Sequence, residues 1–289
     1  MNLLSFAKVN LYLEVINKRR DGYHSLRTIF ERISLADRVI LKTRRDNLIK
    51  VSSDKKIVPR NEGNLCFKAA KLLRDKFEPS KGLDIKIIKR IPVGAGLGGG
   101  SSNAAAVLMG LNKLWRLNLT KSELAKFAGK VGSDVAFFVH DTSFAKASGR
   151  GERIKPLKSL KKLSFCHILV VPEIHVSTPL IYDKFDRFSG LTKPTGNVKL
   201  FTSVLAKESH SLLKPGLLFN SLEEVTIRLY PEVKRIKNTL LQMGLDNILM
   251  SGSGPAVFAI TSSSKNAAKL AKLLRKRERT WRVFVVETV

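Results

Sequence analysis

Residues 92–106, PVGAGLGGGSSNAAA, contain five glycines, then two serines and an alanine-rich stretch. Glycine allows the chain to adopt positive φ and lets another group approach the backbone amides closely. The N-terminus of a helix adds unpaired N–H groups and a partial positive charge. A glycine-rich loop that leads into a helix is therefore suited to bind an anion, and we predict that its ligand is phosphate. The alternative is a flexible turn between a strand and a helix.

The loop fits neither of two common nucleotide-binding motifs. Its spacing, Gly94-Ala-Gly96-Leu-Gly98-Gly99, puts a glycine where the dinucleotide-binding motif has a variable residue, and no acidic partner follows at the expected distance. The Gly-Lys-Ser/Thr sequence of a P-loop occurs nowhere in the chain. If this loop holds phosphate, it must do so in another way.

The first half of the chain contains the elements that must position the loop. Alternating and β-branched residues predict four strands, at 8–16, 37–43, 47–53 and 83–91. Helices are predicted at 64–76 and 101–115, and a third starts at Thr120 with Glu123 as its capping box. Residues 132–138 are predicted to form a loop that turns into an apolar stretch.

The second half mixes strands and helices without a repeat. Strands are predicted at 165–171, at 247–260 with an interruption by glycines, and at 281–288, and helices are predicted at 178–186, 219–229, 231–243 and 265–277. The basic segment 156–164 lacks apolar periodicity and is a suitable boundary. We therefore predict an α+β protein with an N-terminal domain of residues 1–156 and a C-terminal domain of residues 157–289.

The composition is that of a globular protein with an unusual charge. The 289 residues include 52 Lys and Arg against 24 Asp and Glu, a formal net charge of +28. This excess favours anionic partners such as nucleic acid, acidic membranes or phosphorylated metabolites, without choosing among them. The basic residues are spread along the chain, so a generally basic surface is an equal alternative. Because no apolar run reaches the length of a membrane span and the N-terminus lacks a leader pattern, we expect a cytoplasmic protein.

Five stretches, taken together, resemble one superfamily. They are Phe6-Ala7-Lys8-Val9-Asn10-Leu11, the glycine loop with its serines, Gly132-Ser133-Asp134-Val135, Ser251-Gly252-Ser253-Gly254, and Arg20-Asp21-Gly22-Tyr23-His24. The first four resemble, in order and spacing, the motifs of the GHMP kinase superfamily. The fifth is similar to the branch that phosphorylates the 2-hydroxyl of 4-diphosphocytidyl-2-C-methyl-D-erythritol in the non-mevalonate isoprenoid pathway.

The resemblance implies a fold and a nucleotide site. The fold is the two-domain GHMP kinase fold, with an N-terminal domain like domain 2 of ribosomal protein S5 and a ferredoxin-like α+β C-terminal domain. The loop would wrap the phosphates of ATP through Gly94, Gly96, Gly98, Gly99, Gly100, Ser101 and Ser102. The Ser102 hydroxyl would lie near the phosphates or Mg²⁺. Asn64 and Lys89 fall near the adenine pocket, although Asn64 could instead cap its helix and Lys89 could be solvated.

The resemblance also assigns the acceptor side of the site. Asp134 is the expected base for the acceptor hydroxyl, and Lys8 is expected to orient Asp134 and stabilise the developing alkoxide. For the substrate, Asn10 would lie beside the methylerythritol hydroxyls. Tyr23 and Tyr182 would lie on the faces of the cytosine and His24 at its edge.

Two other functions stay open at this point. The chain could be a mevalonate or homoserine kinase, against which Asp21-Gly22-Tyr23-His24 is the discriminating feature. It could also be an S5-like nucleic-acid-binding protein, against which an intact Lys8, Asp134 and glycine loop argue. We expect small-molecule partners, no specific nucleic acid and no membrane, and either a monomer or a homodimer.

The charge leads to a first prediction. If the +28 is a general surface property, duplex DNA should bind weakly and lose affinity steeply as salt rises, because counterion release is then the whole driving force. Fluorescence anisotropy over a salt series measures this. Tight, sequence-selective binding at physiological salt would contradict it.

Overall fold

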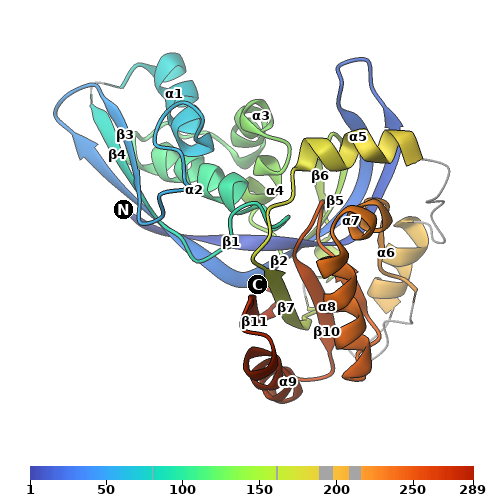
Figure 1. Ribbon diagram of the computed structural model, residues 1–289. Helices are drawn as coiled ribbons and strands as arrows, with labels where there is room; N and C mark the ends of the chain where they lie inside the picture. The colour runs from blue at the N-terminus through green and yellow to red at the C-terminus, as the bar shows by residue number, and fades with distance from the viewer. Residues whose placement is uncertain (80, 161, 189–197, 208–215) are drawn as a thin grey trace.

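The structure contains two sheets flanked by helices (Figure 1). It is a computed structural model that describes residues 1–79, 81–160, 162–188, 198–207 and 216–289. Among the described residues, the first sheet has seven strands and the second has four. The helices α1 to α4 lie on one side of the first sheet, and the second sheet lies on its other side (Figure 1).

Two long antiparallel strands, β1 (Asn2–Lys18) and β2 (His24–Arg44), form the centre of the first sheet. The strand order is β3-β4-β2-β1-β8, and β5 pairs with β2 and with β6. The remaining strands of this sheet are β3 (Ile49–Ser53), β4 (Gly82–Ile88), β5 (Phe144–Gly149), β6 (Arg153–Pro156) and β8 (Phe219–Asn220).

Alternation along β1 divides its side chains between two environments. Ala7, Val9 and Leu11 pack in a hydrophobic cluster with the second sheet. Lys8 and Asn10 point to the opposite face, which is covered by helices. Those helices are α1 (Leu65–Phe77), α2 (Gly99–Leu114), α3 (Lys121–Val131) and α4 (Val135–His140). A single strand therefore joins the two domains with one face and presents polar groups with the other.

The second sheet has the order β11-β7-β10-β9, with neighbouring strands antiparallel. Its strands are β7 (Cys166–Pro172), β9 (Ile248–Met250), β10 (Val257–Thr261) and β11 (Trp281–Glu287). Leu169 and Val171 of β7 face the first sheet, and Ile168 and Val170 face the helical side. Because both faces are buried, β7 reads as a continuous apolar run.

The other helices belong to the C-terminal half. They are the single-turn η1 (Lys158–Leu160), α5 (Thr178–Phe188), α6 (Val198–Lys207), α7 (Glu223–Leu229), α8 (Pro231–Gln242) and α9 (Ser264–Arg277). Helix α5 packs against α7 through Ile181 and Phe185, and it also reaches the ends of β1 and β2 at their hairpin (Figure 1). None of the helices in the part of the chain described here is long and apolar enough to cross a membrane.

The α+β fold is confirmed, and several element predictions were wrong. Strand β2 begins at His24, far before the predicted 37–43. The prediction missed its first part because the buried carboxylates Glu31 and Asp37 interrupt the apolar alternation. The apolar stretch after Asp134, for which no helix or strand was predicted, is the short helix α4. Strands β5 and β6 were not predicted.

Two predicted elements in the C-terminal half are divided by tertiary contacts. The predicted helix at 219–229 begins as strand β8, which pairs in parallel with β1, and becomes helical at Glu223. The predicted strand at 247–260 is two strands joined by a turn. The expected domain boundary lies between β6 and β7, although β8 of the C-terminal half joins the first sheet.

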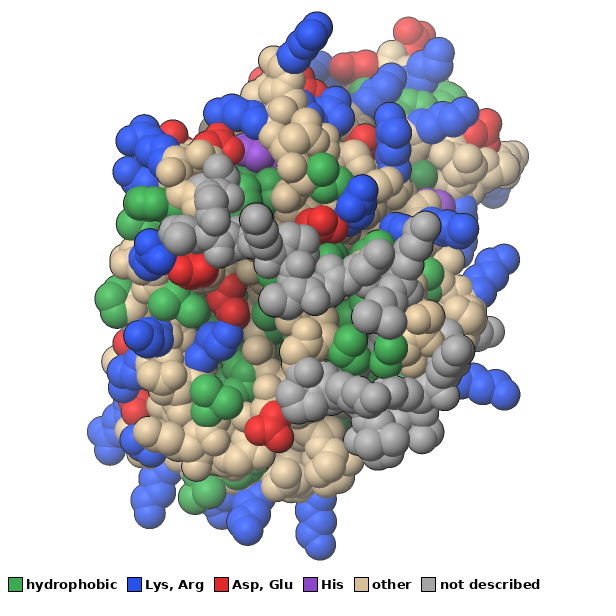
Figure 2. Space-filling view, turned by 90° about the vertical axis from the view of Figure 1, so that its right-hand side faces the viewer, with side chains coloured by type: hydrophobic (Ala, Val, Ile, Leu, Met, Phe, Trp, Pro, Cys, Tyr) green, Lys and Arg blue, Asp and Glu red, His purple; other side chains and the backbone are tan. Residues whose placement is uncertain are grey.

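Basic side chains are spread over the surface. On the face shown in Figure 2, Lys and Arg side chains project around the whole outline, with Asp and Glu among them. They do not form one continuous basic stripe on that face.

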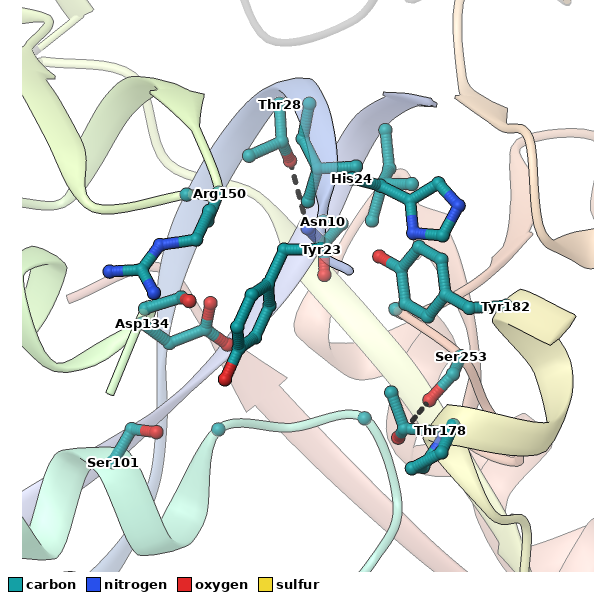
Figure 3. A pocket seen from close by; sticks show the side chains of 18 of the residues that line it. Asn10, Tyr23, His24, Thr28, Ser101, Asp134, Arg150, Thr178, Tyr182 and Ser253 are labelled. Atoms are coloured by element: carbon teal, nitrogen blue, oxygen red, sulfur yellow. Dashed lines mark hydrogen bonds between the residues drawn. The ribbon is translucent and has the colours of Figure 1, made fainter. Parts of the chain in front are cut away.

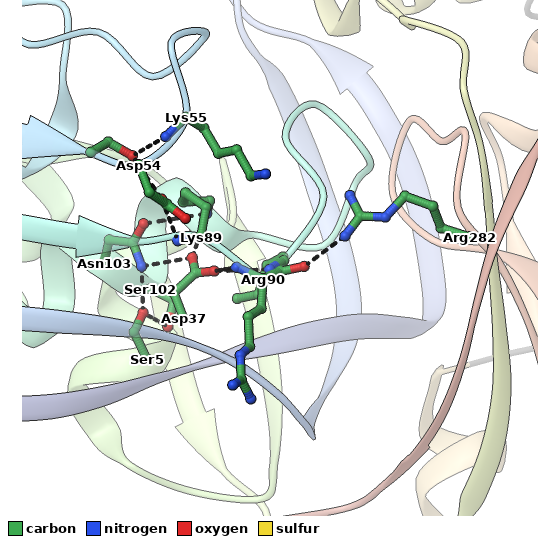
Figure 4. Close-up of polar contacts among 11 residues, drawn as sticks. Ser5, Asp37, Asp54, Lys55, Lys89, Arg90, Ser102, Asn103 and Arg282 are labelled. Carbon is green, nitrogen blue, oxygen red and sulfur yellow. Dashed lines mark hydrogen bonds and ion pairs between the residues drawn. The ribbon is translucent and has the colours of Figure 1, made fainter.

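A buried carboxylate holds the two ends of the glycine loop (Figure 4). Asp37, on β2, is fully buried and forms an ion pair with Lys89. It also accepts hydrogen bonds from the backbone N–H groups of Arg90 (2.7 Å) and Ile91 (2.8 Å), before the loop, and from Asn103 Nδ2 (2.9 Å) on α2, after it. One side chain thus fixes where the loop begins and where its helix begins.

Asp37→Ala should destabilise the protein by about 3–5 kcal/mol, because it leaves the Lys89 ammonium buried without its counter-charge. Urea unfolding followed by circular dichroism measures the loss. The matched control is Asp84→Ala, which removes a carboxylate that is 42% exposed and pairs with Arg44. A surface pair of this kind should contribute about 1 kcal/mol or less. Equal losses for the two variants would contradict the role of Asp37.

Candidate active site

Two cavities meet at the glycine loop. The first has a volume of about 580 Å³ and lies between β1, β2, α4 and α5. The second, of about 470 Å³, lies between the loop and the segment before α1. Gly96, Gly98, Ser101 and Thr178 line both. A ligand in one cavity would therefore meet a ligand in the other over the loop.

The loop adopts a conformation that only glycine accommodates easily. Gly94, Gly96 and Gly98 have φ of 70°, 75° and 67°. A Cβ on Gly96 would lie 2.1 Å from the carbonyl oxygen of Ser251, on the C-terminal domain. Gly98 is the N-cap of α2 and supplies no side-chain cap, so the first N–H groups of the helix stay available to an anion.

Both domains hold the loop in place. Lys8 N–H donates to the carbonyl of Leu97 at 3.0 Å. From the C-terminal domain, Ser251 Oγ donates to the carbonyl of Gly96 at 3.0 Å, and Ala256 N–H donates to that of Ala95 at 3.3 Å. The loop is therefore fixed in the interface between the domains.

A chain of polar groups crosses the floor of the first cavity. Lys8 Nζ donates to Asn10 Oδ1 at 2.6 Å, Asn10 Nδ2 donates to Thr28 Oγ1 at 2.8 Å, and Thr28 Oγ1 donates to the carbonyl of Tyr12 at 2.6 Å. Lys8 Nζ also lies 3.6 Å from Asp134 Oδ2. Each polar atom in this chain has a partner, which fixes the direction of the ammonium group.

Lys8 and Asp134 differ in their exposure. The Lys8 side chain is 5% exposed, whereas that of Asp134 is 31% exposed and lines the first cavity. Burial lowers the pKa of Lys8, and the neighbouring Asp134 carboxylate opposes that change. Asp134 lies at the start of α4, where Gly132 and Ser133 precede it. An accessible carboxylate can accept a proton from a bound hydroxyl, and a buried ammonium beside it can stabilise the negative charge left on the hydroxyl oxygen.

Aromatic side chains form the outer part of the first cavity (Figure 3). Tyr23 is 54% exposed, and the Arg150 guanidinium lies 4.9 Å from the centre of its ring. His24 stacks on Tyr182, with ring centres 4.7 Å apart and planes at 26°. Burial, and then the charge of Asp134, raise the pKa of Tyr182. Tyr23 and Arg150 lie on the side of Asp134, and the His24–Tyr182 pair lies across from them (Figure 3).

The second cavity contains the residues expected near adenine, but their polar groups are occupied. Asn64 caps α1 by accepting from Cys66 N–H at 2.8 Å, and it donates to the carbonyl of Pro59 at 2.6 Å. The Lys89 ammonium pairs with buried Asp37 and is not solvated. Both line the cavity, together with Gly94, Gly99 and Gly100 of the loop. These two side chains therefore shape the cavity wall, and their polar groups are engaged within the protein.

The structure does not bring the Ser102 hydroxyl to either cavity. The side chain is buried, and its oxygen accepts from Ser5 Oγ at 2.8 Å in the network around Asp37. The preceding Ser101 lines both cavities. Along a helix, adjacent residues point about 100° apart, so only one of the two serines can face the loop.

Sequence reasoning did not find several residues of the first cavity. They are Lys18, Thr28, Arg150, Thr178 and Asp186. Asp186 follows Tyr182 by four residues in a predicted helix, a spacing that places both on one face, so a signal was present. Arg150 directly follows β5, and Thr28 lies in the N-terminal part of β2; the sequence predicted neither stretch as a strand, which left no basis for placing these two residues.

Family models match both halves of the chain: GHMP kinases N terminal domain over residues 64–142 and GHMP kinases C terminal over residues 201–279. The chain is similar to 4-diphosphocytidyl-2-C-methyl-D-erythritol kinase of Bacillus pumilus (strain SAFR-032), with 43% identity over 93% of this chain and 91% of the relative.

Among solved structures, one of 4-(cytidine 5'-diphospho)-2C-methyl-D-erythritol kinase has 34% identity, a TM-score of 0.82 and full coverage of both chains. A mevalonate kinase structure has a TM-score of 0.71 at 17% identity, which shows the fold alone. The chain therefore belongs to the GHMP kinases, and among them to the family of 4-diphosphocytidyl-2-C-methyl-D-erythritol kinases.

Proposed function

We propose that the protein transfers the γ-phosphoryl group of ATP to the 2-hydroxyl of 4-diphosphocytidyl-2-C-methyl-D-erythritol, a step of non-mevalonate isoprenoid biosynthesis. The observation that carries the proposal is the Lys8–Asp134 pair, which lies in a cavity that opens onto the glycine loop. Family membership supports the substrate, because the relatives are named for it.

The two cavities suit the two substrates. ATP would lie in the second cavity with its phosphates over the loop, where Gly96, Gly98 and the start of α2 offer backbone N–H groups. The alcohol would lie in the first cavity, with its reacting hydroxyl beside Asp134 and its other hydroxyls near Asn10. The γ-phosphoryl group and the acceptor would then meet at the residues common to both cavities.

The transfer requires a proton acceptor and neutralisation of charge. The acceptor oxygen forms a bond to the γ-phosphorus as the bond from that phosphorus to the bridging oxygen breaks, which releases ADP. Asp134 takes the hydroxyl proton. The Lys8 ammonium, held in place by Asn10, stabilises the charge that develops on the acceptor oxygen. Its burial strengthens this effect because little water screens it.

Mg²⁺ is part of the proposal. The described residues contain no cluster of three or more His, Cys, Asp and Glu side chains that could hold a metal. This fits Mg²⁺, which takes many of its ligands from nucleotide phosphates and water. Ser101, which lines both cavities, is the residue that would contribute a protein oxygen. The ion would neutralise phosphate charge during transfer.

A coupled assay for ADP release tests the proposal directly. The cytidylyl alcohol, mevalonate and homoserine are offered one at a time with ATP and Mg²⁺. We expect ADP release with the cytidylyl alcohol and none with mevalonate or homoserine. Turnover with mevalonate or homoserine and none with the cytidylyl alcohol would overturn the assignment.

Asp134→Asn should preserve substrate binding and lower kcat by about 10²- to 10⁴-fold, since the amide keeps the shape of the side chain and cannot accept the proton. Lys8→Met should also lower kcat. The double variant should lose less than the product of the two single losses, because both residues act on one hydroxyl. Steady-state kinetics and calorimetric binding measure these effects. A folded Asp134→Asn enzyme with kcat within about threefold of the parent would exclude Asp134 as the base.

Tyr23→Ala should weaken binding of the cytidylyl alcohol by about 1–3 kcal/mol, the usual contribution of base stacking on an aromatic ring. Binding of ATP should be nearly unchanged, because Tyr23 lines the first cavity and not the second. Tyr23→Phe, which keeps the ring, is the control and should have a mild effect. Equal weakening of both ligands would show that Tyr23 is structural.

A further inference from the structure

The Asp186 carboxylate, on α5, fixes the side chain of His24, which lines the first cavity. Asp186 Oδ1 lies 2.6 Å from His24 Nε2, and its other oxygen accepts from Lys18 Nζ at 2.7 Å. Tyr182, one turn earlier on the same helix, stacks on the His24 ring. Two residues of α5 therefore hold the His24 ring: Tyr182 contacts its face, and Asp186 contacts its Nε2 edge.

The direction of the Asp186–His24 hydrogen bond follows from the charge of the carboxylate. Partial burial acts to raise the pKa of Asp186, but the hydrogen bonds from Lys18 and His24 outweigh it and leave that pKa below its ordinary value. An ionised carboxylate can only accept, so His24 Nε2 must carry the proton. In a neutral imidazole, Nδ1 is then an acceptor, and it has no hydrogen-bond partner among the residues described here.

We propose that Asp186 is a positioning residue that holds His24 as its Nε2–H tautomer, so that Nδ1 accepts from an exocyclic amino group and selects a cytidylyl over a uridylyl substrate. The inference rests on the proposed function. Cytosine carries an amino group at position 4, which donates, whereas uracil carries an oxygen there, which accepts. The oxygen at position 4 of uracil would place its lone pairs against the lone pair of His24 Nδ1, and the two would repel.

The stacking geometry supports this recognition. Because the His24 and Tyr182 planes differ by 26°, a pyrimidine lying in the plane of the imidazole would also lie nearly parallel to the Tyr182 ring. Tyr182 would then contact the base through its face, and His24 would contact its edge. A site built around a directional hydrogen bond rejects a base that cannot make it, since a desolvated polar atom would be left unpaired.

The test compares kcat/KM for 4-diphosphocytidyl-2-C-methyl-D-erythritol and for its 4-diphosphouridyl analogue. The parent enzyme should favour the cytidylyl substrate strongly. Asp186→Ala should lower that preference by about tenfold or more, mainly through KM of the cytidylyl substrate, with KM for ATP little changed. Asp186→Asn keeps an acceptor oxygen and should retain more of the preference.

The matched control is Asp183→Ala. Asp183 carries the same charge on the same helix and also lines the first cavity, but it pairs with Arg187 and not with His24, so the ratio of the two kcat/KM values should be that of the parent. ¹⁵N chemical shifts of the His24 ring provide a second readout that does not require turnover. The free parent enzyme should show a protonated Nε2 and an unprotonated Nδ1, and Asp186→Ala should show a mixture of tautomers.

An unchanged base preference in Asp186→Ala would overturn the inference, as would a protonated Nδ1 in the free parent enzyme at neutral pH. A loss of equal size in Asp183→Ala would also overturn it, because charge near the cavity would then be the cause. These outcomes leave the proposed function standing as long as the parent enzyme phosphorylates the cytidylyl substrate. Failure of the parent enzyme with that substrate would count against the function itself.

Discussion

The close approach of the glycine loop to the backbone of the C-terminal domain is the constraint on which the site depends. The space between Gly96 and the Ser251 carbonyl is too small for any side chain. This contact brings the loop to the interface of the two domains, where Ser251 and Ala256 bind its carbonyls. The loop carbonyls are thereby engaged on the protein side, and Gly96 and Gly98 line both cavities.

Buried charged side chains stabilise this arrangement of the loop. Asp37 neutralises Lys89 and accepts from backbone N–H groups in the segment between β4 and the loop. Lys8 is equally buried, but it has only a partly exposed carboxylate 3.6 Å away as its counter-charge. The contrast separates two roles for a buried lysine. An ammonium paired with a buried carboxylate fixes the scaffold, whereas one whose counter-charge lines a cavity can stabilise a negatively charged transition state.

The C-terminal domain also orients a side chain of the N-terminal domain in the first cavity. Helix α5 extends to the end of the β1–β2 hairpin (Figure 1) and carries Tyr182 and Asp186, which contact His24 from two directions. His24, from the N-terminal domain, is thus oriented by the C-terminal domain. Any change in the relative position of the two domains would alter both the glycine loop and the orientation of the His24 ring, since both depend on contacts between the domains.

The sequence by itself was sufficient for the fold class and for the family, because these depend on local signals. Glycines that require positive φ, a capping box at Thr120 and alternating strands can be read from neighbouring residues. Alternation along β1 also places Lys8 and Asn10 on one face. The distance between Lys8 and Asp134, more than a hundred residues apart, cannot be read in this way.

Only the tertiary structure decided which polar groups are free to act. Ser101 and Ser102 are equivalent in sequence, yet the network of Ser5 and Asp37 takes the hydroxyl of Ser102 and leaves Ser101 on the cavities. The part of β2 before residue 37 was missed because Glu31 and Asp37 are buried charges, and their partners His167 and Lys89 come from distant parts of the chain. Burial of a charge depends on a partner supplied by the fold, and residues far apart in the chain carry no local mark of that pairing.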